Sequence, residues 1–324
     1  MNKILAETLK MIRKEFGEES VLTLREKSST NIKRVSSGSL KIDHILGGGL
    51  PLGRMVEIYG PEMSGKTTLT LHILAECMKM FPDKCAAFID AEHALDPKYA
   101  EALGVDMDRL LITQPDSGEQ GLEIAEALVR SGNVSAVIID SVDALTPLVS
   151  LEGEMGDRHV APLARLMSQA TRKLSGAVSK TDTLLVFVNQ IRDKVGIAYG
   201  NPEFTSGGRA LKFYTTQRLE IRRTGKPEEH SVQARVKCVK NKVSRPFLET
   251  TIEIEYGKGI VLIGEIVDLG AEYGFIEKAG AWYKIDGKSV AQGKPTMIEL
   301  LKEDTELYNK LYTDVYNKIF SKTS

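Results

Sequence analysis

The sequence predicts an α/β protein whose core is a mostly parallel sheet with helices on both faces. Short apolar runs at 55–59, 86–89, 136–139 and 184–188 are typical of buried strands, and helical stretches such as 67–80 and 120–131 separate them. Each run ends in a glycine or a polar residue. Ligands of open α/β sheets lie beyond the carboxyl ends of the strands, so these ends predict the functional site.

Composition excludes several other classes of protein. Of the 324 residues, 42% are hydrophobic and 27% are charged, which excludes a disordered chain. Lys plus Arg is 43 and Asp plus Glu is 44, so the net charge of −1 indicates nothing about nucleic acid. Three cysteines argue against a disulfide scaffold. With no apolar run long enough to span a membrane and no apolar signal core, we expect a cytoplasmic protein without a membrane partner.

The first part of the chain, residues 1–30, forms a separate segment in the sequence pattern. Leu5, Leu9, Ile12 and Phe16 recur at helical spacing, and Gly17 is a plausible helix end. The run 20–24 is a candidate strand, and the polar stretch KSSTNIK that follows is typical of a linker. A helix and a strand cannot bury their apolar faces alone, so we expect them to pack on the rest of the chain or on a neighbouring subunit.

Two further parts follow this segment. Residues 31–263 hold the predicted α/β core, whose end from about 219 onward has a more β-like texture. Residues 264–324 are expected to form a small α/β domain, with a glycine-rich turn region and a helical end at 296–320.

The segment 60–67 fits the pattern G-x-x-x-x-G-K-[ST] of a phosphate-binding loop, and it stands between a predicted strand and a predicted helix as that motif requires. Backbone N–H groups of such a loop and the helix N-terminus attract anions. Lys66 is expected to reach the β- and γ-phosphates, and Thr67 to bind Mg²⁺. The predicted ATP contacts are Gly60, Pro61, Glu62, Met63, Ser64, Gly65, Lys66, Thr67 and the adjoining Thr68.

Polar residues at the other strand ends are candidates for the chemistry. Asp140 is the expected second group on the Mg²⁺ side, although a strand-end Asp is often only a cap. Glu92 and Asp90 are both candidates to activate an attacking water, and either could instead cap the next helix. Gln190 offers a neutral amide that could sense a γ-phosphate, with a polar turn as the plain alternative.

The segment 209–245 carries eleven basic residues against three acidic ones, an excess of +8 that suits a polyanion, although such runs are usually solvated sheet faces. Before it lies a glycine-bearing loop, 191–208, with basic and aromatic residues suited to tracking single-stranded nucleic acid. A second loop is 151–160. The helix predicted at 162–178 places Ser168 and Arg172 on one face.

These segments together resemble the bacterial RecA recombinases. The resemblance runs from about residue 3 to about residue 300, and its telling segments include FVNQIRDKVG, GNPEFTSGGRALKFY, VKCVKNKV and GEIVDLGAEYGFIEKAGAWY. The succession of NQIR, GNPE, GGRALKFY and KNK is the specific part. It implies an N-terminal helix and strand that pack on the adjacent subunit, a core ATPase and a small C-terminal domain. It also implies helical homo-filaments that form with ATP on single-stranded DNA, homologous pairing with double-stranded DNA, and strand exchange.

The resemblance also implies roles for individual residues. Glu92 corresponds to the catalytic carboxylate, Gln190 to the switch between γ-phosphate and the DNA loop, and Asp140 to a group that holds Mg²⁺ through water. Asp96 and Tyr99 correspond to adenine contacts, and Lys240 and Lys242 to the pair that reaches ATP on the neighbouring subunit. Lys212 and Phe213 correspond to subunit-interface residues. The candidate DNA contacts are Ser168, Arg172, Arg192, Val195, Gly207, Gly208 and Arg209.

The sequence departs from the family pattern in places. Met63 stands where a small residue is common, and Phe204 and Arg209 are unusual in the second DNA loop; we expect these to tune affinity. The printed sequence ends in NKIFSKTS without the acidic tail that many members carry, and we therefore expect easier binding to duplex DNA.

Three other functions remain as alternatives: a ring helicase or motor of the same fold, a small-molecule P-loop kinase, and an ATP-binding scaffold that coats DNA with little turnover. The sequence leaves open whether the chain promotes self-cleavage of a LexA-type repressor.

Overall fold

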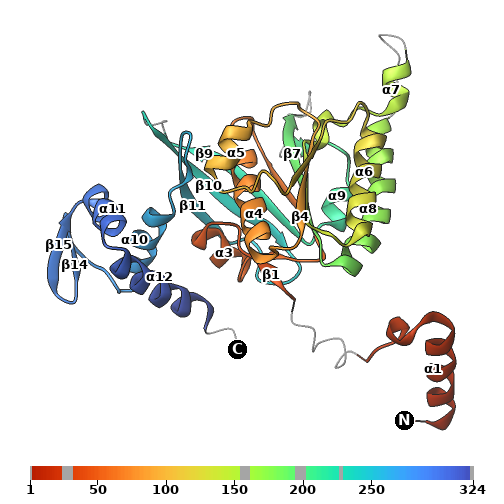
Figure 1. Cartoon of the computed structure of the whole chain (residues 1–324), viewed down its shortest axis with the longest axis horizontal. Coiled ribbons are helices and arrows are strands. Elements are labelled where there is room, and N and C mark those ends of the chain that lie inside the picture. Colours follow the sequence, from red (N-terminus) through yellow and green to blue (C-terminus); the bar gives the residue numbers. More distant parts are fainter. Residues whose placement is uncertain (1, 24–31, 154–160, 194–201, 226–228, 322–324) are drawn as a thin grey trace. The chain divides into compact units, whose positions relative to one another are not determined.

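The computed structural model describes residues 2–23, 32–153, 161–193, 202–225 and 229–321, and it divides into two units, 1–33 and 34–324 (Figure 1). A ten-stranded sheet runs through the larger unit. Its strands, in spatial order, are β12 (Gly259–Ile260), β11 (Glu249–Glu255), β10 (Ser231–Asn241), β9 (Gln217–Thr224), β3 (Met55–Gly60), β7 (Leu184–Asp193), β6 (Val134–Asp140), β4 (Cys85–Asp90) and β5 (Leu110–Thr113), with β8 (Glu203–Thr205) paired to the end of β7.

The strands from β9 to β5 are parallel, and β10, β11 and β12 extend the sheet in antiparallel fashion. The predicted fold class is therefore confirmed. The register is the feature that builds a site: Asp90 lies opposite Asp140, and Gly60 opposite Gln190. The carboxyl ends of these four strands consequently reach the same edge of the sheet.

Alternation along the buried strands fills two cores, one on each face of the sheet. On β4, Phe88 joins the core that includes α3 (Leu40–Leu46) and α4 (Lys66–Met80), whereas Ala87 and Ile89 join the opposite core. That second core contains α6 (Gly118–Ser131), α8 (Pro162–Thr181) and α9 (Ala210–Tyr214). Strands that are buried on both faces have continuous apolar sequences. This explains why the apolar runs predicted the positions of these strands.

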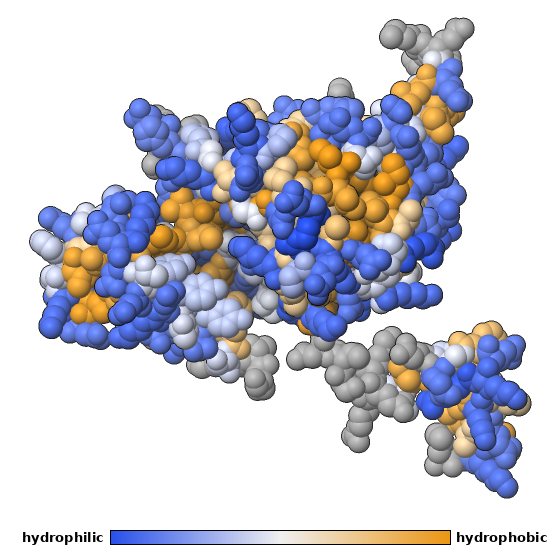
Figure 2. Space-filling view, in the orientation of Figure 1, coloured by the Kyte–Doolittle hydropathy of each residue, from blue (hydrophilic) through white to orange (hydrophobic). Residues whose placement is uncertain are grey.

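Short elements complete the core. They are β1 (Arg34–Val35) and β2 (Leu50–Pro51), which pair with each other, α5 (Pro97–Ala102), the 3₁₀ helix η2 (Val142–Ala144) and α7 (Leu148–Glu152). Figure 2 shows that apolar side chains reach the surface of the core between the positions of α4 and α6 in Figure 1. Leu111 and Ile112 of the edge strand β5 are among the exposed apolar residues of this unit, at 42% and 53% exposure.

The smaller unit contains α1 (Lys3–Phe16) and the 3₁₀ helix η1 (Glu18–Ser20). Gly17 ends α1 as predicted, with a positive φ of 96°. The strand predicted at 20–24 is wrong for the described part, since Ser20 closes η1 and no strand follows over 21–23. Residues 2–23 and 32–33 of this unit contain no partner strand, and a lone strand has nothing to satisfy its backbone groups. Much of the KSSTNIK stretch lies outside the described residues.

The C-terminal part begins with α10 (Leu262–Glu272) and continues through a three-stranded sheet of β13 (Glu277–Ala279), β14 (Trp282–Ile285) and β15 (Lys288–Gln292). It ends in two helices, α11 (Lys294–Glu303) and α12 (Thr305–Phe320), rather than the single helical stretch expected at 296–320. Asp304 separates them, because its carboxylate accepts from the Leu307 N–H and caps α12.

The expectation of an irregular loop over 191–208 is wrong at both of its ends. Strand β7 continues to Asp193, and β8 returns antiparallel to it, with Ile191 opposite Thr205. Residues 194–201 lie outside the described chain, as do 154–160 of the other predicted loop. In the described part of the chain, no helix is long and apolar enough to cross a membrane.

Arg109 locks the C-terminal end of α4 to the start of β4. Its Nη1 donates to the carbonyl oxygens of Met78, Phe81, Pro82 and Lys84 at 3.0–3.3 Å, and its Nε pairs with Asp106. We predict that Arg109→Ala lowers the free energy of unfolding by about 1.5–3 kcal/mol, because these carbonyls lose a charged donor. Urea unfolding followed by circular dichroism measures the change.

The matched control is Arg130→Ala, which removes a surface pair with Glu126 at i,i+4 and should cost about 0.5 kcal/mol or less. Equal losses in the two variants would contradict a special role for Arg109.

Candidate functional site

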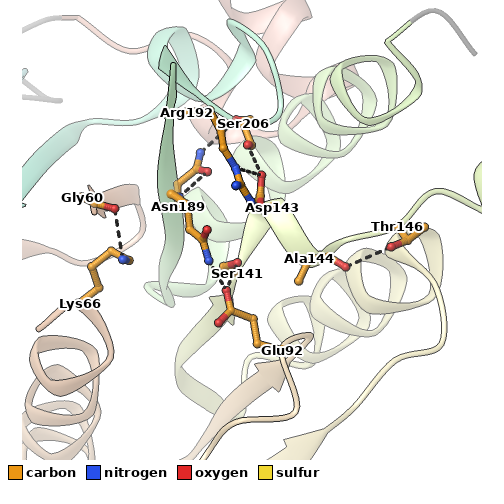
Figure 3. Close-up of polar contacts among 11 residues, drawn as sticks. Gly60, Lys66, Glu92, Ser141, Asp143, Ala144, Thr146, Asn189, Arg192 and Ser206 are labelled. Atoms are coloured by element: carbon orange, nitrogen blue, oxygen red, sulfur yellow. Dashed lines mark hydrogen bonds and ion pairs between the residues drawn. The ribbon is translucent and has the colours of Figure 1, made fainter. Parts of the chain in front are cut away.

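The loop between β3 and α4 has the geometry of an anion cradle. Gly65 ends the loop in the left-handed region with φ 97° and caps α4, whose first N–H groups are directed into the loop. A Cβ on Gly60 would lie 2.0 Å from the Ile221 carbonyl oxygen, so only glycine fits against β9. Lys66 Nζ donates to the carbonyl oxygens of Gly60 at 3.2 Å and Pro61 at 2.7 Å (Figure 3).

Two buried groups of this loop fit a phosphate. The Ser64 hydroxyl is buried and has no hydrogen-bond partner within the described residues, and it stands inside the loop. Burial lowers the pKa of Lys66, and the charges of Asp140, Glu92 and Glu62 oppose that shift. A buried ammonium and an orphan hydroxyl beside helix N–H groups make a site in which a polyphosphate supplies the missing partners.

Thr67 and Asp140 meet beside the loop. Thr67 Oγ1 donates to Asp140 Oδ2 at 2.8 Å. Burial raises the pKa of Asp140 to about 6, with the hydrogen bond from Thr67 opposing and the charge of Glu92 adding to the rise. A hydroxyl and a carboxylate in contact are oxygen donors of the kind that Mg²⁺ takes alongside waters and phosphates. The described residues hold no group of three or more His, Cys, Asp or Glu side chains that would bind a metal without a phosphate.

A cavity of 670 Å³ opens next to the loop and is large enough for a nucleoside. Thr68, Asp96 and Tyr99, the residues expected to contact the nucleotide from this side, line it, and Thr68 Oγ1 lies 2.9 Å from the Tyr99 hydroxyl. Sequence reasoning missed the opposite wall, formed by Arg223, Val232, Ile254, Glu255, Tyr256 and Gly257. Arg223 comes from β9, the others come from β10, β11 and the turn after β11, and no local motif marks them.

Glu92 and Asp90 differ sharply in their surroundings. Asp90 is 2% exposed and its carboxylate accepts from the N–H groups of Ala94 and Leu95, so it holds the turn after β4. Glu92 accepts instead from the Ser141 hydroxyl and, at 2.9 Å, from Gln190 Nε2 (Figure 3). Of the two carboxylates left open by the sequence, only Glu92 faces the space between the strand ends.

A chain of contacts leads from Glu92 to the segment after β7. Gln190 N–H donates to Asn189 Oδ1, and Asn189 Nδ2 donates to the Ser206 carbonyl at 3.0 Å and to Glu57. Gln190 is therefore bonded to Glu92 through its side chain and is linked, through the side chain of Asn189, to the backbone at Ser206.

The candidate DNA residues lie on α8, on β7 at Arg192, and in the turn between β8 and α9. A Cβ on Gly208 would lie 2.8 Å from Ala164 of α8, and one on Gly207 would lie 2.9 Å from Val142, so both glycines permit close packing on α8 and η2. Ser168 and Arg172 of α8 line a cavity of 620 Å³ that also includes Ala164. Arg209 is exposed at the start of α9, and Val195 lies outside the described residues.

The structure also brings Lys240, Lys242, Lys212 and Phe213 together. Lys240 Nζ donates to the carbonyl oxygens of Lys212 and Phe213, and Lys242 Nζ donates to that of Phe213 at 2.9 Å. The two lysines thus meet at the end of α9, where backbone carbonyls attract cations. Burial, with the nearby charges of Lys242 and Arg218, lowers the pKa of Lys240 to about 8.

The basic excess at 209–245 is smaller than the sequence suggested, because acidic partners come from outside the segment. Arg218 pairs with the fully buried Glu57, Arg222 with Glu203, and Lys237 with Glu249. Much of the predicted charge therefore supports the sheet.

A phosphate loop that opens onto parallel strands, with a hydroxyl–carboxylate pair beside it and a second carboxylate on the adjoining strand, defines a P-loop nucleotide-hydrolysing protein. Two family descriptions match the chain, RecA N-terminal domain over residues 3–261 and RecA C-terminal domain over residues 264–320. The chain belongs to the RecA family, and the resemblance seen in its sequence is confirmed. It is therefore a nucleotide-binding, DNA-dependent ATPase of recombination and repair.

Relatives extend over nearly the whole length. The chain is 52% identical over 314 residues to Protein RecA of Macrococcus caseolyticus, covering 95% of this chain and 88% of that protein. It is 52% identical over 324 residues to Protein RecA of Mannheimia haemolytica, covering 98% and 88%. It is 51% identical over 328 residues to Protein RecA of Thioalkalivibrio sulfidiphilus, covering 99% and 95%. The match in the C-terminal part favours this family over a ring helicase or a P-loop kinase.

The raised pKa of Asp140 yields a prediction about stability. Its pKa is about 6 in the folded protein, above the ordinary value of 3.8, so above pH 6 folding buries an ionised carboxylate. Between pH 6 and pH 4 the folded state takes up a proton that the unfolded state does not, and stability from this group rises. We predict that Asp140→Asn raises the free energy of unfolding at pH 7.5 by about 1–3 kcal/mol, and by about half as much at pH 5.

Urea unfolding in EDTA without nucleotide, at both pH values, measures this difference. The exposed Asp108→Asn is the control and should show the same small change at pH 7.5 and pH 5. A less stable Asp140→Asn at pH 7.5, or a gain that persists unchanged at pH 5, would show that the buried charge is not the cause.

Proposed function

We propose that this chain assembles with ATP and Mg²⁺ into helical filaments on single-stranded DNA and catalyses homologous pairing and strand exchange with double-stranded DNA. The observation that carries the proposal is the hydrogen bond between Glu92 and Gln190. It joins a carboxylate beside the phosphate loop to the strand that leads into the 191–208 segment, so one contact can report nucleotide state to the DNA elements.

At the nucleotide, Lys66 would neutralise the β- and γ-phosphates, and Thr67 and Asp140 would hold Mg²⁺, Asp140 through water. Asp96 and Tyr99 contact adenine in the cavity beside the loop. Mg²⁺ supplies charge neutralisation for the phosphates when bound. The remaining loop contacts come from the backbone of residues 60–65 and from Thr68.

Glu92 acts on the attacking water. A carboxylate that already accepts from Ser141 and Gln190 has a fixed orientation, and it keeps a lone pair for a water at the γ-phosphate. When Gln190 turns its amide to a γ-phosphate oxygen, its hydrogen bond to Glu92 breaks. The movement of Gln190 then shifts the start of the 191–208 segment. Hydrolysis removes that oxygen and lets Gln190 return.

The DNA backbone binds at Ser168 and Arg172 of α8 and at the neighbouring Arg192, Gly207, Gly208 and Arg209, with Val195 in the intervening segment. Glycines at 207 and 208 let phosphates approach backbone N–H groups, and the arginines neutralise charge. Several basic residues of the 209–245 segment are paired with glutamates of the same chain. The surface beside α8 is therefore the better-supported site for the DNA strand.

Filament assembly places ATP between subunits. Lys240 and Lys242 reach the neighbour's phosphates, and Lys212 and Phe213 contact the neighbour; Phe213 is 69% exposed. Residues 1–30 pack on the core of the adjacent subunit. Exposed apolar residues on both surfaces support this contact: Leu5 and Phe16 on α1, and Leu111 and Ile112 on β5. The core spans 31–263 and the small domain 264–324. The chain acts in the cytoplasm.

We predict that Glu92→Gln retains nucleotide binding and lowers the DNA-stimulated rate of ATP hydrolysis by about 10²–10⁴-fold, because the amide cannot take a proton from water. A Gln side chain can still accept from Ser141 and Gln190, so the fold should persist. Phosphate release with and without single-stranded DNA measures the rate, and Glu101→Gln on the exposed face of α5 is the control. A Glu92→Gln protein with normal turnover would remove Glu92 from the mechanism.

We predict that Lys240→Ala keeps ATP binding to the isolated chain and abolishes DNA-stimulated hydrolysis, because the lysine acts on the ATP of the next subunit. Fluorescent-nucleotide binding and steady-state hydrolysis on long single-stranded DNA separate the two effects. Lys79→Ala on α4 removes a surface lysine without this role and should change neither. Full stimulation in Lys240→Ala would sink the trans-subunit assignment.

A further inference from the structure

Asp143 is a charged residue that neither the phosphate loop nor the predicted DNA contacts account for. It lies in η2, three residues after the end of β6. Its carboxylate accepts from Arg192 through Nη2 and, at 3.4 Å, through Nε, and it also accepts from the Ser206 hydroxyl (Figure 3). One side chain therefore bonds to both ends of the segment 191–208.

The two partners lie on opposite sides of a hairpin. Arg192 stands on β7 opposite Phe204 of β8, and Ser206 follows β8 directly. Ser206 is held a second time through its carbonyl, which accepts from Asn189 at 3.0 Å. Asp143 thus ties both strands of the hairpin to η2. On β7 the tie is at Arg192, two residues after Gln190.

The charges indicate that the contact is an ion pair that DNA can reach. The Arg192 side chain is 50% exposed and that of Asp143 is 20% exposed. Burial would raise the pKa of Asp143, but the bonds from Arg192 and Ser206 hold that pKa below its ordinary value. Asp143 is therefore ionised at neutral pH, and Arg192 already has an anionic partner in the absence of DNA.

We propose that Asp143 competes with the DNA backbone for Arg192, so that the Asp143–Arg192 pair is a latch that must open when single-stranded DNA binds. The inference rests on the proposed role of Arg192 in contacting DNA. It adds that the affinity for DNA is held down from within the chain, by a carboxylate that takes no part in ATP hydrolysis.

The physical consequence is an exchange of one anion for another. When the Arg192 guanidinium turns to a phosphate, Asp143 keeps only Ser206 and faces a second negative charge. The gain from the new contact is reduced by the loss of the old one, and the net release of counterions is smaller than a free arginine would give. The latch thereby weakens binding through Arg192 alone. DNA binds tightly only when it also contacts the other proposed DNA-binding residues.

The test uses the full-length protein with a non-hydrolysable ATP analogue and a fluorescent oligo(dT). Asp143→Asn removes the charge and keeps an oxygen that accepts from Arg192 or Ser206. We expect it to bind oligo(dT) about two- to fivefold more tightly, the size of a partly exposed ion pair. The salt dependence of binding should be steeper, and ATPase stimulation should reach half its maximum at a lower DNA concentration.

Asp193→Asn is the matched control, because it removes the same charge from the next residue of β7, which is exposed. It should raise affinity less and leave the salt dependence unchanged. Arg192→Gln supplies the second control: in that background Asp143→Asn should no longer tighten binding, since the two changes act through one pair. If Asp143→Asn is poorly folded, Asp143→Ser provides the same removal of charge with a smaller side chain.

Equal gains in Asp143→Asn and Asp193→Asn would overturn the latch, as would a folded Asp143→Asn with unchanged or weaker binding, or a gain that survives in Arg192→Gln. The proposed function fails differently. In that case the unaltered protein would neither bind oligo(dT) with the ATP analogue nor show stimulated hydrolysis.

Discussion

The register of the parallel strands is the constraint on which the site depends. Asp90 lies beside Asp140 and Gly60 beside Gln190, and this register sets the relative positions of four strand ends. A shift of one residue on β4, β6 or β7 would turn the polar side chain of Asp90, Asp140 or Gln190 to the other face of the sheet. That register is fixed by continuous apolar strands buried on both faces, whose alternate residues fill two different cores. The site is thus held together mainly by the burial of apolar side chains in the two cores, away from the residues that contact the nucleotide. The hydrogen bond between Glu92 and Gln190 is possible because that burial leaves the strands no freedom to slide.

Local signals in the sequence located the parts of the site that local physics determines. The phosphate loop, its strand and its helix follow from glycine spacing and apolar periodicity, and the strand-end polar residues follow from the ends of apolar runs. The choice between Asp90 and Glu92 could not be made this way. It depends on which carboxylate the turn after β4 uses for its own backbone N–H groups.

The features that sequence reasoning missed depend on long-range pairing. The far wall of the nucleotide cavity, at Arg223 of β9 and Tyr256 after β11, lies more than 150 residues from the loop in the sequence. The +8 excess overstated the free positive charge, because Glu57, Glu203 and Glu249 reach the segment only in the folded chain. Asp143 gave no signal at all, since its importance lies in two partners about 50 and 60 residues away. The sequence of 191–208 has no regular periodicity, so it predicts a loop. The pairing of β7 with β8 at its two ends is visible only in the structure.

The bonds from Lys66 to the carbonyl oxygens of Gly60 and Pro61 have a consequence for specificity. The loop supplies its own weak substitute for a phosphate, so the ammonium keeps hydrogen-bond partners while no nucleotide is bound. A ligand must therefore offer more than two neutral carbonyls to displace that arrangement. A singly charged anion gains little by doing so, whereas the adjacent charged oxygens of a polyphosphate gain a great deal. The loop thereby favours polyphosphates over small singly charged anions.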